Sequence, residues 1–250
     1  MNARYAVYFI PEPGTALATL GSALLGRDSE TGRVIPQTPL PGFPSQCLHD
    51  LTADARRYGL HATLKAPFFL AQGMAEHDLL LAAANFAMSG QSIILPRLEL
   101  VRIGSFFALV PSAKKPEEQK AVESINMLAA DAVSFFNPFR AAPSEQESAR
   151  REPQKLTARQ RSLLAEWGYP YVFDEYRFHI TLTGKLRDSG EARSMEKCLR
   201  AYFTPVCNEE MVVASICVCR QIAPDPTSIA DARPDNNGSA FIPIMRFGFQ

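Results

Sequence analysis

Two short strings of the sequence match each other and lie almost half a chain apart. Residues 61–64 read HATL and residues 179–182 read HITL, so both follow the pattern H-x-T-L. Each string lies in a segment rich in β-forming residues, which predicts strands over residues 60–69 and 176–186. An internal duplication would give this spacing. The pattern therefore predicts two comparable halves, each contributing one such strand.

The remaining segments alternate between strand and helix patterns. Further strands are expected over residues 4–10, at the apolar run MVVASICVC and at the C-terminal FIPIMRFGF, with a hairpin turning near Gly104-Ser105. Helices are expected over residues 13–26, 47–57, 75–89, 116–136, 156–167 and 188–203. This order differs from the run of βαβ units with a glycine-rich first turn that dinucleotide folds show.

Three segments are predicted as loops. Residues 27–46 hold several prolines, residues 141–155 are charged, and residues 222–238 are polar. The first and third either shape or cover a site, because binding residues often lie on loops over a scaffold, or are plain surface connections.

Side-chain parity separates a polar face from an apolar face along the two H-x-T-L strands. The polar faces are expected to carry His61, Thr63 and Lys65 on the first strand and Arg177, His179, Thr181 and Thr183 on the second. The apolar faces are expected to pack against helices. If the halves lie side by side, the two polar faces converge in one cleft.

Such a cleft favours the hydrolysis of a phosphodiester. Opening one needs a base to take a proton from water and an acid to protonate the leaving oxygen, and an unperturbed histidine serves either role near neutral pH. Thr63 and Thr181 are expected to donate hydrogen bonds to the non-bridging phosphate oxygens. Lys65, Arg177 and Thr183 would add charge or hydrogen bonds. We therefore expect His61 and His179 to be the catalytic pair.

Other chemistries find less support in the sequence. A single H-x-T on a strand is weak evidence, because both residues are tolerated there, and the argument depends on the two copies. No H-x-H, H-E-x-x-H or C-x-x-C zinc pattern and no G-x-S-x-G elbow occurs, so neither a metal ion nor another cofactor is expected. Neither GxGxxG nor GxxxxGK[ST] occurs.

The charge balance and the cysteines bear on which partners and which cellular compartment are expected. Lys+Arg and Asp+Glu number 26 each, which gives no basic excess for tracking a long nucleic acid. The five cysteines match no disulfide framework, and Cys217 and Cys219 are expected to be core filler on one strand face. The first apolar run is too short for a signal peptide, and no membrane span is present. We expect a cytoplasmic protein.

The sequence resembles the two-histidine phosphoesterase superfamily through the motif pairs His61/Thr63 and His179/Thr181. RYAVYFIP at 4–11, LHATLKAPF at 60–68 and WGYPYVFDEYRFHITLTG at 167–184 resemble a bacterial branch associated with phosphonate-utilisation operons. The resemblance implies an α+β fold of two pseudo-symmetric lobes, each an antiparallel-rich sheet with helices on its outer face, around a central cleft. It implies a single domain over residues 1–250, with interleaved lobes.

The resemblance also implies metal-independent cyclic phosphodiesterase or RNA-end chemistry. The phosphonate branch suggests a phosphoribosyl 1,2-cyclic phosphate as the substrate, by association rather than from residues. A small phosphate ester is therefore the expected partner. Two alternatives stay open: an RNA-end phosphodiesterase or ligase, and a non-catalytic phosphate-binding protein of the phosphonate pathway.

Several assignments are left open by the sequence. Tyr5 is a further candidate for binding substrate, but Tyr5 and Tyr8 face opposite ways on their strand, and core packing is the default for each. Which histidine is the acid, which ester bond breaks and the oligomeric state are also undetermined.

Overall fold

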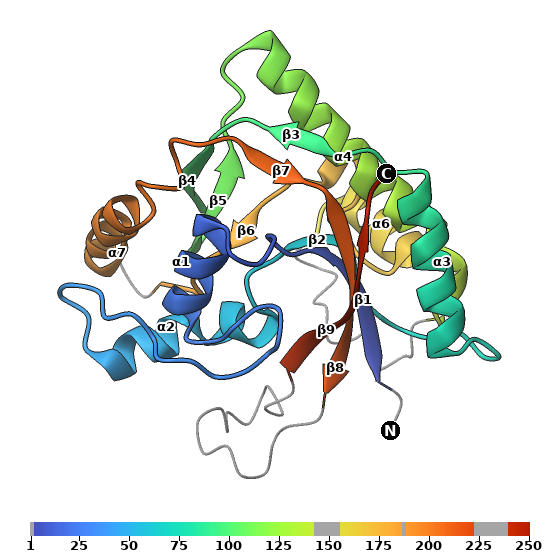
Figure 1. The fold of residues 1–250 in the computed structure, drawn as a ribbon, viewed down its shortest axis with the longest axis horizontal. Helices are drawn as coiled ribbons and strands as arrows, with labels where there is room; N and C mark the ends of the chain where they lie inside the picture. Colours follow the sequence, from blue (N-terminus) through green and yellow to red (C-terminus); the bar gives the residue numbers. More distant parts are fainter. Residues whose placement is uncertain (1–2, 143–155, 187–188, 223–239) are drawn as a thin grey trace.

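The structure is a computed structural model that describes residues 3–142, 156–186, 189–222 and 240–250 (Figure 1). The strands are β1 (Arg4–Phe9), β2 (Ala62–Phe69), β3 (Ile93–Leu95), β4 (Leu98–Ile103), β5 (Phe106–Pro111), β6 (Ile180–Thr181), β7 (Met211–Val213), β8 (Ser215–Ile222) and β9 (Ala240–Gly248). The α-helices are α1 (Ala16–Leu25), α2 (Ser45–Tyr58), α3 (Glu76–Met88), α4 (Pro116–Phe135), α6 (Ala158–Trp167) and α7 (Ser189–Tyr202). Two short 3-10 turns are η1 (Asn137–Phe139) and η3 (Phe173–Glu175).

All strand pairs are antiparallel, and helices flank the sheets on two sides. Helices α1, α2 and α7 lie on one side, and α3, α4 and α6 lie on the other (Figure 1). The predicted α+β class with antiparallel sheets is confirmed. None of the helices within the described residues is long and apolar enough to cross a membrane.

The larger sheet has the order β2-β1-β8-β9, so strands from the two ends of the chain lie side by side. Nearly all of β1 is buried, because its sequence YAVYF is apolar on both faces. β9 is an edge strand, which suits Pro243, since proline has no N–H to donate to a second neighbour. The other edge is β2, which carries Thr63 of the first string.

A second sheet has the order β4-β5-β6, and β3 pairs with β7. The predicted hairpin is confirmed: Ile103 pairs with Phe106, which leaves Gly104 and Ser105 as the turn. Gly104 has φ +57°, a conformation that glycine adopts without strain. β6 is an edge strand of its sheet, as β2 is of the larger one. Both H-x-T-L strings therefore end up on sheet edges.

Capping residues fix the ends of the predicted helices. Thr15 caps α1 by accepting a hydrogen bond from the Ala18 N–H at 3.2 Å, so the helix begins after Pro13 rather than at it. Gly26 and Gly168 end α1 and α6 in the left-handed conformation, with φ +68° and +77°. The end of α6 at Trp167 agrees with the predicted helix over residues 156–167.

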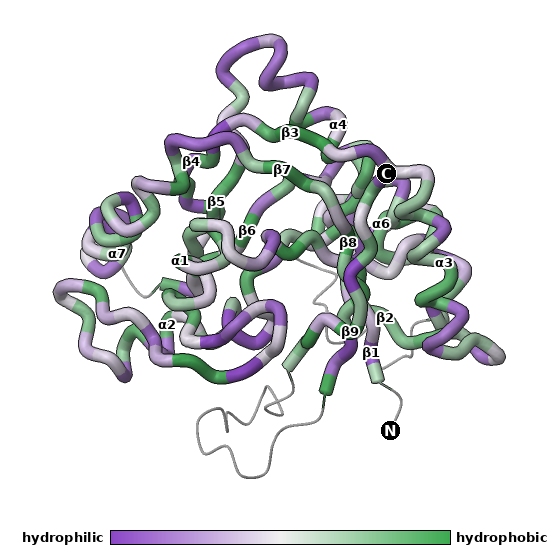
Figure 2. Tube along the Cα trace, in the orientation of Figure 1, coloured by the Kyte–Doolittle hydropathy of each residue, from purple (hydrophilic) through white to green (hydrophobic). Residues whose placement is uncertain are grey.

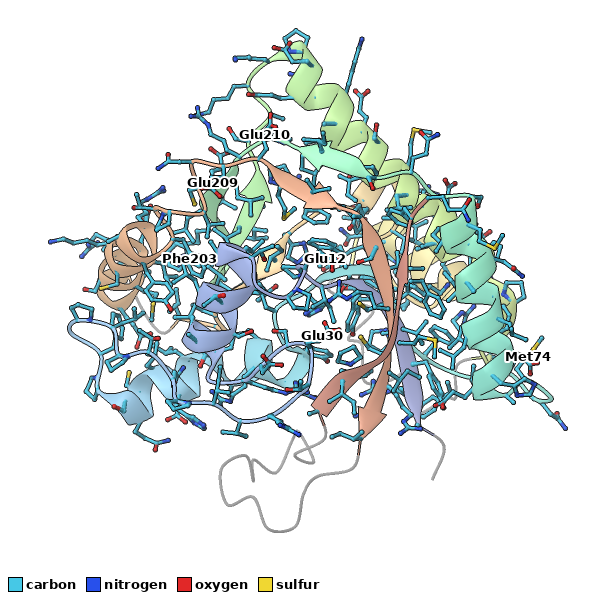
Figure 3. The ribbon with its side chains drawn as sticks, in the orientation of Figure 1. Glu12, Glu30, Met74, Phe203, Glu209 and Glu210 are labelled. Atoms are coloured by element: carbon cyan, nitrogen blue, oxygen red, sulfur yellow. The ribbon has the colours of Figure 1, made fainter. Side chains whose placement is uncertain are left out.

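Two of the buried clusters lie on the two faces of the larger sheet. The larger joins β1 to the second sheet and to Phe203, which follows α7 and is fully buried (Figure 3). The smaller lies on the other face of the larger sheet and comprises Ala6, Tyr8, Ile10, Cys217, Cys219 and Phe241. In Figure 2 the strands are mainly hydrophobic, whereas the helices are of mixed character. The expectation that Cys217 and Cys219 are core residues is confirmed.

The strand predicted over residues 176–186 is wrong in length. Only Ile180 and Thr181 pair with β5. Tyr176 instead ends the turn η3. Beyond β6 the Thr183 hydroxyl accepts the Phe107 N–H at 3.0 Å, a bond that a backbone carbonyl would take in a continuing ladder.

The run MVVASICVC forms two strands rather than one. β7 pairs with β3, whereas β8 pairs with β1 and β9, and Ala214 separates them. The Phe249 N–H bonds the Ala214 carbonyl at 2.8 Å at this point. An apolar run alone does not show where a strand changes sheets.

The predicted loops are placed only in part. Residues 27–46 are irregular up to α2 but are anchored, because Arg27 pairs with Val34 and the Gln37 side chain donates to the Leu24 carbonyl at 2.7 Å. Nearly all of residues 141–155 and 222–238 lie outside the described residues.

Candidate active site

His61 lies between the end of α2 and the start of β2. Its Nδ1 donates to the Gly59 carbonyl at 2.9 Å, so the lone pair of the neutral imidazole is on Nε2. The Thr63 hydroxyl lies 3.3 Å from that Nε2 and donates to it. Gly59 has φ +74°, so a glycine allows the chain to turn from the helix into the strand here.

His179 makes the same local hydrogen bond. Its Nδ1 donates to the Arg177 carbonyl at 2.8 Å, again two residues earlier in the chain. Its Nε2 is therefore also left for chemistry. Thr181 pairs with Ala108 in β6, and its hydroxyl makes no hydrogen bond within the described residues. Each string thus presents one Nε2 and one threonine hydroxyl.

The two strings face each other. β2 and β6 are edge strands, and the Tyr176 hydroxyl donates to the Thr63 carbonyl at 2.9 Å, which links the segment before His179 to β2. His179 is also close enough for its charge to lower the pKa of His61. The structure therefore brings the two strings into contact, with His179 within electrostatic range of His61.

Burial sets the ionisation of His61. Its ring packs on Tyr8, with centroids 4.2 Å apart, and on Tyr58 at 5.7 Å. Burial lowers its pKa to about 4, helped by the charges of His179 and Arg27, while the bond to the Gly59 carbonyl opposes the shift. His61 is thus a neutral imidazole near pH 7. Its surroundings differ from those of His179, whose ring lies 6.0 Å from Phe106.

Lys65 does not share a face with His61 and Thr63, so that expectation is wrong. Thr63 pairs with Tyr8, but Lys65 pairs with Val7, because a β-bulge adds one residue to β2 between them. The bulge turns Lys65 to the face of the larger core. There its ammonium donates to the Val133 carbonyl at 2.9 Å and to Asn137 Oδ1 at 3.3 Å, at the end of α4.

Replacing Lys65 with methionine is expected to remove a pH-dependent part of the stability. Burial, together with the charge of Arg140, lowers the Lys65 pKa from 10.5 to about 7. Unfolding then takes up a proton between these values, so the free energy of unfolding rises with pH there, by at most about 1.4 kcal/mol per pH unit. Urea unfolding from about pH 7 to about pH 10 should show this rise in the wild type and a flatter profile in Lys65→Met. Parallel profiles would contradict the assignment.

Three other predicted binding residues occupy different places. Thr183 is buried, and its hydroxyl accepts the Phe107 N–H, so it supports the sheet. Tyr5 faces the larger core, and its hydroxyl donates to Glu76 Oε2 at 2.9 Å. Arg177 is exposed beside His179 and contributes its carbonyl to that ring. Of the three, Arg177 alone adjoins an imidazole in the described structure.

Tyr8, Tyr58 and Tyr176 contact the two strings, and none of the three was among the predicted site residues. Core packing was the default expectation for Tyr8. A longer repeat identifies two of them. Residues 58–64 read YGLHATL and residues 176–182 read YRFHITL, so the pattern extends to Y-x-[LF]-H-x-T-L. Tyr8 has no such signal, because only the cross-strand register places it opposite Thr63.

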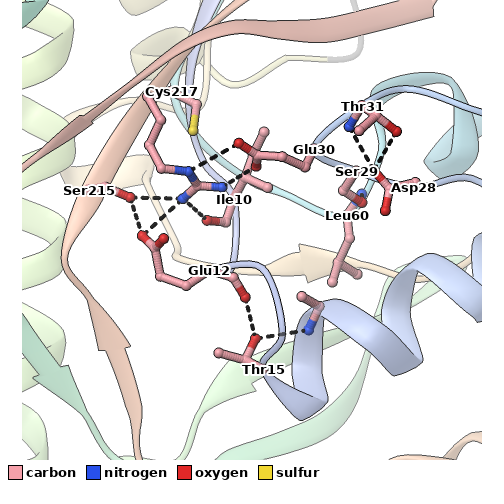
Figure 4. A network of polar contacts seen from close by, with 12 residues as sticks. Ile10, Glu12, Thr15, Asp28, Ser29, Glu30, Thr31, Leu60, Ser215 and Cys217 are labelled. Carbon is pink, nitrogen blue, oxygen red and sulfur yellow. Dashed lines mark hydrogen bonds and ion pairs between the residues drawn. The ribbon is translucent and has the colours of Figure 1, made fainter.

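Buried Arg27 and half-buried Arg246 bind several main-chain carbonyls and carboxylates near this region. Arg27 donates to the carbonyls of Gly32, Arg56, Arg57 and Phe241, which ties the 27–34 loop to α2 and β9. Arg246 of β9 binds Glu12 at 3.0 Å and also Glu30, and it donates to Ser215 and the Ile10 carbonyl (Figure 4). Figure 3 shows Glu12 and Glu30 near the centre of the molecule.

The chain matches the model of one protein family. The family described as "Protein of unknown function (DUF1045)" matches residues 63–227, well over half of the chain. The chain belongs to this family. The match begins at the first motif threonine and includes the whole of the second string.

Two curated relatives share the same name. The chain is 37% identical over 248 residues to "Ribose 1,5-bisphosphate phosphokinase PhnN" of Janthinobacterium sp. (strain Marseille), a match covering 98% of this chain and 51% of that protein. It is 37% identical over 187 residues to the protein of that name from Laribacter hongkongensis (strain HLHK9), covering 73% and 40%. The chain therefore spans about half the length of these relatives, or less.

Solved structures align over the full length at low similarity. They include E. coli LigT complexed with 3'-AMP, with a TM-score of 0.38 and 13% identity, covering 100% of this chain and 99% of LigT. A structure titled as a phosphoesterase gives a TM-score of 0.40 and 12% identity, with the same coverage. TT0787 of Thermus thermophilus gives 0.36 and 13%, covering 98% and 97%.

Proposed function

We propose that the chain is a two-histidine phosphoesterase that hydrolyses a small cyclic phosphodiester without a metal ion. The observation that carries the proposal is the matched pair of Nδ1-to-carbonyl hydrogen bonds in His61 and His179. In each ring Nδ1 donates to the main chain, which leaves Nε2 available for proton transfer. A threonine two residues later accompanies each ring.

We assign His61 as the base and His179 as the acid. His61 is neutral near pH 7, so its Nε2 accepts a proton from the attacking water. The water oxygen bonds to phosphorus and the bond from phosphorus to one sugar oxygen breaks. His179, which carries a proton on both ring nitrogens at the start of the step, gives its Nε2 proton to that oxygen. With substrate bound, the Thr63 hydroxyl turns from His61 Nε2 to one non-bridging oxygen and Thr181 donates to the other. Both oxygens gain charge in the transition state. Arg177 offsets part of that charge from the rim.

This assignment predicts an unusual acid limb in the pH dependence. Because the His61 pKa is lowered to about 4, kcat/KM should rise as the pH passes about 4 and reach its plateau below the ordinary histidine value of 6.5. Initial rates from about pH 3.5 to about pH 8 measure the limb. An acid limb between pH 6 and 7 would show that His61 is not the neutral base.

We propose a ribose phosphate as the substrate class. The curated relatives are named for a reaction of ribose 1,5-bisphosphate, and the sequence resembles a branch from phosphonate-utilisation operons. A phosphoribosyl 1,2-cyclic phosphate combines a ribose phosphate with the cyclic diester that the two histidines suit. No GxxxxGK[ST] loop occurs in this sequence, so we do not propose the kinase reaction of the relatives for it.

A substrate panel with EDTA present tests the proposal. We expect hydrolysis of the phosphoribosyl cyclic phosphate, slower hydrolysis of 2′,3′-cyclic nucleotides, and no loss of rate on chelation. Activity abolished by EDTA would contradict the metal-free mechanism. Salt-sensitive binding of RNA with turnover of RNA ends alone would support the RNA-end alternative. Binding of the cyclic phosphate without turnover would support a non-catalytic protein.

A further inference from the structure

The extended repeat gives each histidine a tyrosine three residues earlier, and the two tyrosines have different contacts. Tyr58 packs its ring on Phe241, with centroids 5.2 Å apart, and on His61. Tyr176 uses its hydroxyl, which donates to the Thr63 carbonyl at 2.9 Å. Tyr58 thus packs its ring beside the histidine of its own string, whereas Tyr176 forms a hydrogen bond to the opposite string.

The bond from Tyr176 joins two sheet edges. β2 and β6 are edge strands of separate sheets, and an edge strand leaves a row of backbone groups without strand partners. Within the described residues, this is the one hydrogen bond between segments 58–64 and 176–182. Burial raises the pKa of the Tyr176 phenol above its ordinary value, so the hydroxyl stays protonated and remains a donor.

We propose that Tyr176 is a positioning residue that sets the separation of the two histidines by holding the Thr63 carbonyl. The inference rests on the proposed function, because that separation matters for a reaction that uses both imidazoles. Tyr176 does not touch the reacting atoms. It acts through the two strings that carry them.

The contacts on either side of the bond lead directly to the two rings. On one side, Thr63 places its hydroxyl 3.3 Å from His61 Nε2. On the other side, Tyr176 precedes Arg177, whose carbonyl holds His179 Nδ1 at 2.8 Å. A change in the Tyr176–Thr63 distance therefore moves one imidazole relative to the other. A misplacement of about 1 Å costs on the order of 10²-fold in rate.

Tyr176→Phe tests the inference, and Tyr202→Phe is its matched control. Tyr202 also donates to a distant backbone carbonyl, that of Leu20 at 3.1 Å, but it joins α7 to α1. Both variants lose one hydroxyl and keep the ring, so both should lower the melting temperature slightly. We expect Tyr176→Phe to lower kcat by about 10- to 100-fold with KM within about threefold. Tyr202→Phe should stay within about twofold of wild type in both constants.

A second measurement separates this inference from the proposed function. Nitrogen-15 spectra of the imidazoles, recorded across pH, should show shifted His61 and His179 signals in Tyr176→Phe and wild-type signals in Tyr202→Phe. If the wild type turns over no cyclic phosphate, the proposed function fails while the spectra still test the positioning. Imidazole signals of Tyr176→Phe that superimpose on the wild type, or a kcat within threefold of it, would overturn the inference.

Discussion

Replacing either motif histidine by glutamine, as His61→Gln or His179→Gln, is expected to lower kcat by about 10³–10⁴-fold. Each variant keeps a polar side chain of similar size but loses the proton transfer at Nε2. The two residues act in one step, so the double variant should be little slower than either single one. Steady-state and single-turnover assays on the cyclic phosphate measure these losses.

The control for this experiment is His77→Gln. His77 is largely exposed, and its ring faces the neighbouring Asp78. Its replacement should leave kcat within about twofold of wild type. Loss of activity in only one of the two motif variants would mean that a single imidazole carries the reaction, and the two-histidine mechanism would then be wrong. Circular dichroism establishes that each variant is folded.

Replacing Arg246 with methionine is expected to destabilise the fold by about 3 kcal/mol and to lower the melting temperature by roughly 5–10 °C. The Arg246 side chain is 17% exposed and pairs with both Glu12 and Glu30. Methionine keeps much of the volume but leaves two carboxylates facing each other without a cation. It also removes the donor to the Ile10 carbonyl, which ties β9 to the end of β1.

Arg200→Met is the matched control for that loss. Arg200 pairs with Glu196 one turn earlier on α7, and both side chains are well exposed. Such a pair is worth about 0.3–0.5 kcal/mol, so the variant should unfold close to the wild type. Urea unfolding of the three proteins compares the two effects. Equal losses in the two variants would show that the Arg246 pairs contribute no more than a surface pair.

Most of the helices and strands could be predicted from local sequence patterns. Hydrophobic periodicity and capping residues such as Gly168 predict most helix positions, because these signals act within a few residues. The two H-x-T-L strings mark both imidazoles and both threonines from the amino-acid order alone. The equivalent hydrogen bonds of His61 and His179 show that the match extends to local geometry.

Contacts that depend on the pairing of distant segments could not be predicted from local sequence pattern. Strict alternation placed Lys65 beside Thr63, but the bulge opposite β1 reverses its face. Thr183 was expected to be the fourth polar residue on one face of the second strand, yet its hydroxyl accepts the Phe107 N–H. Of the two tyrosines on β1, Tyr8 and not Tyr5 packs on His61, because Thr63 lies opposite Tyr8. Each outcome depends on register, which one segment does not contain.

The same distinction applies to the bond between Tyr176 and Thr63. Both residues lie in recognisable strings, but their hydrogen bond joins positions that are 113 residues apart in the sequence. It forms because two sheets happen to present their edge strands to each other. Sequence similarity between the strings therefore marks the parts of the site, and only the assembled sheets show how the parts are held together.

Phosphorus NMR of the purified chain with a phosphoribosyl 1,2-cyclic phosphate, in oxygen-18 water with EDTA, tests the central claim most directly. We expect the cyclic diester signal to be replaced by a monoester signal with the isotope shift of one oxygen-18 bound to phosphorus. The His61→Gln and His179→Gln variants should leave the diester intact on the same time scale. A wild-type diester signal that persists, or oxygen-18 found only on the sugar, would contradict the two-histidine phosphoesterase mechanism.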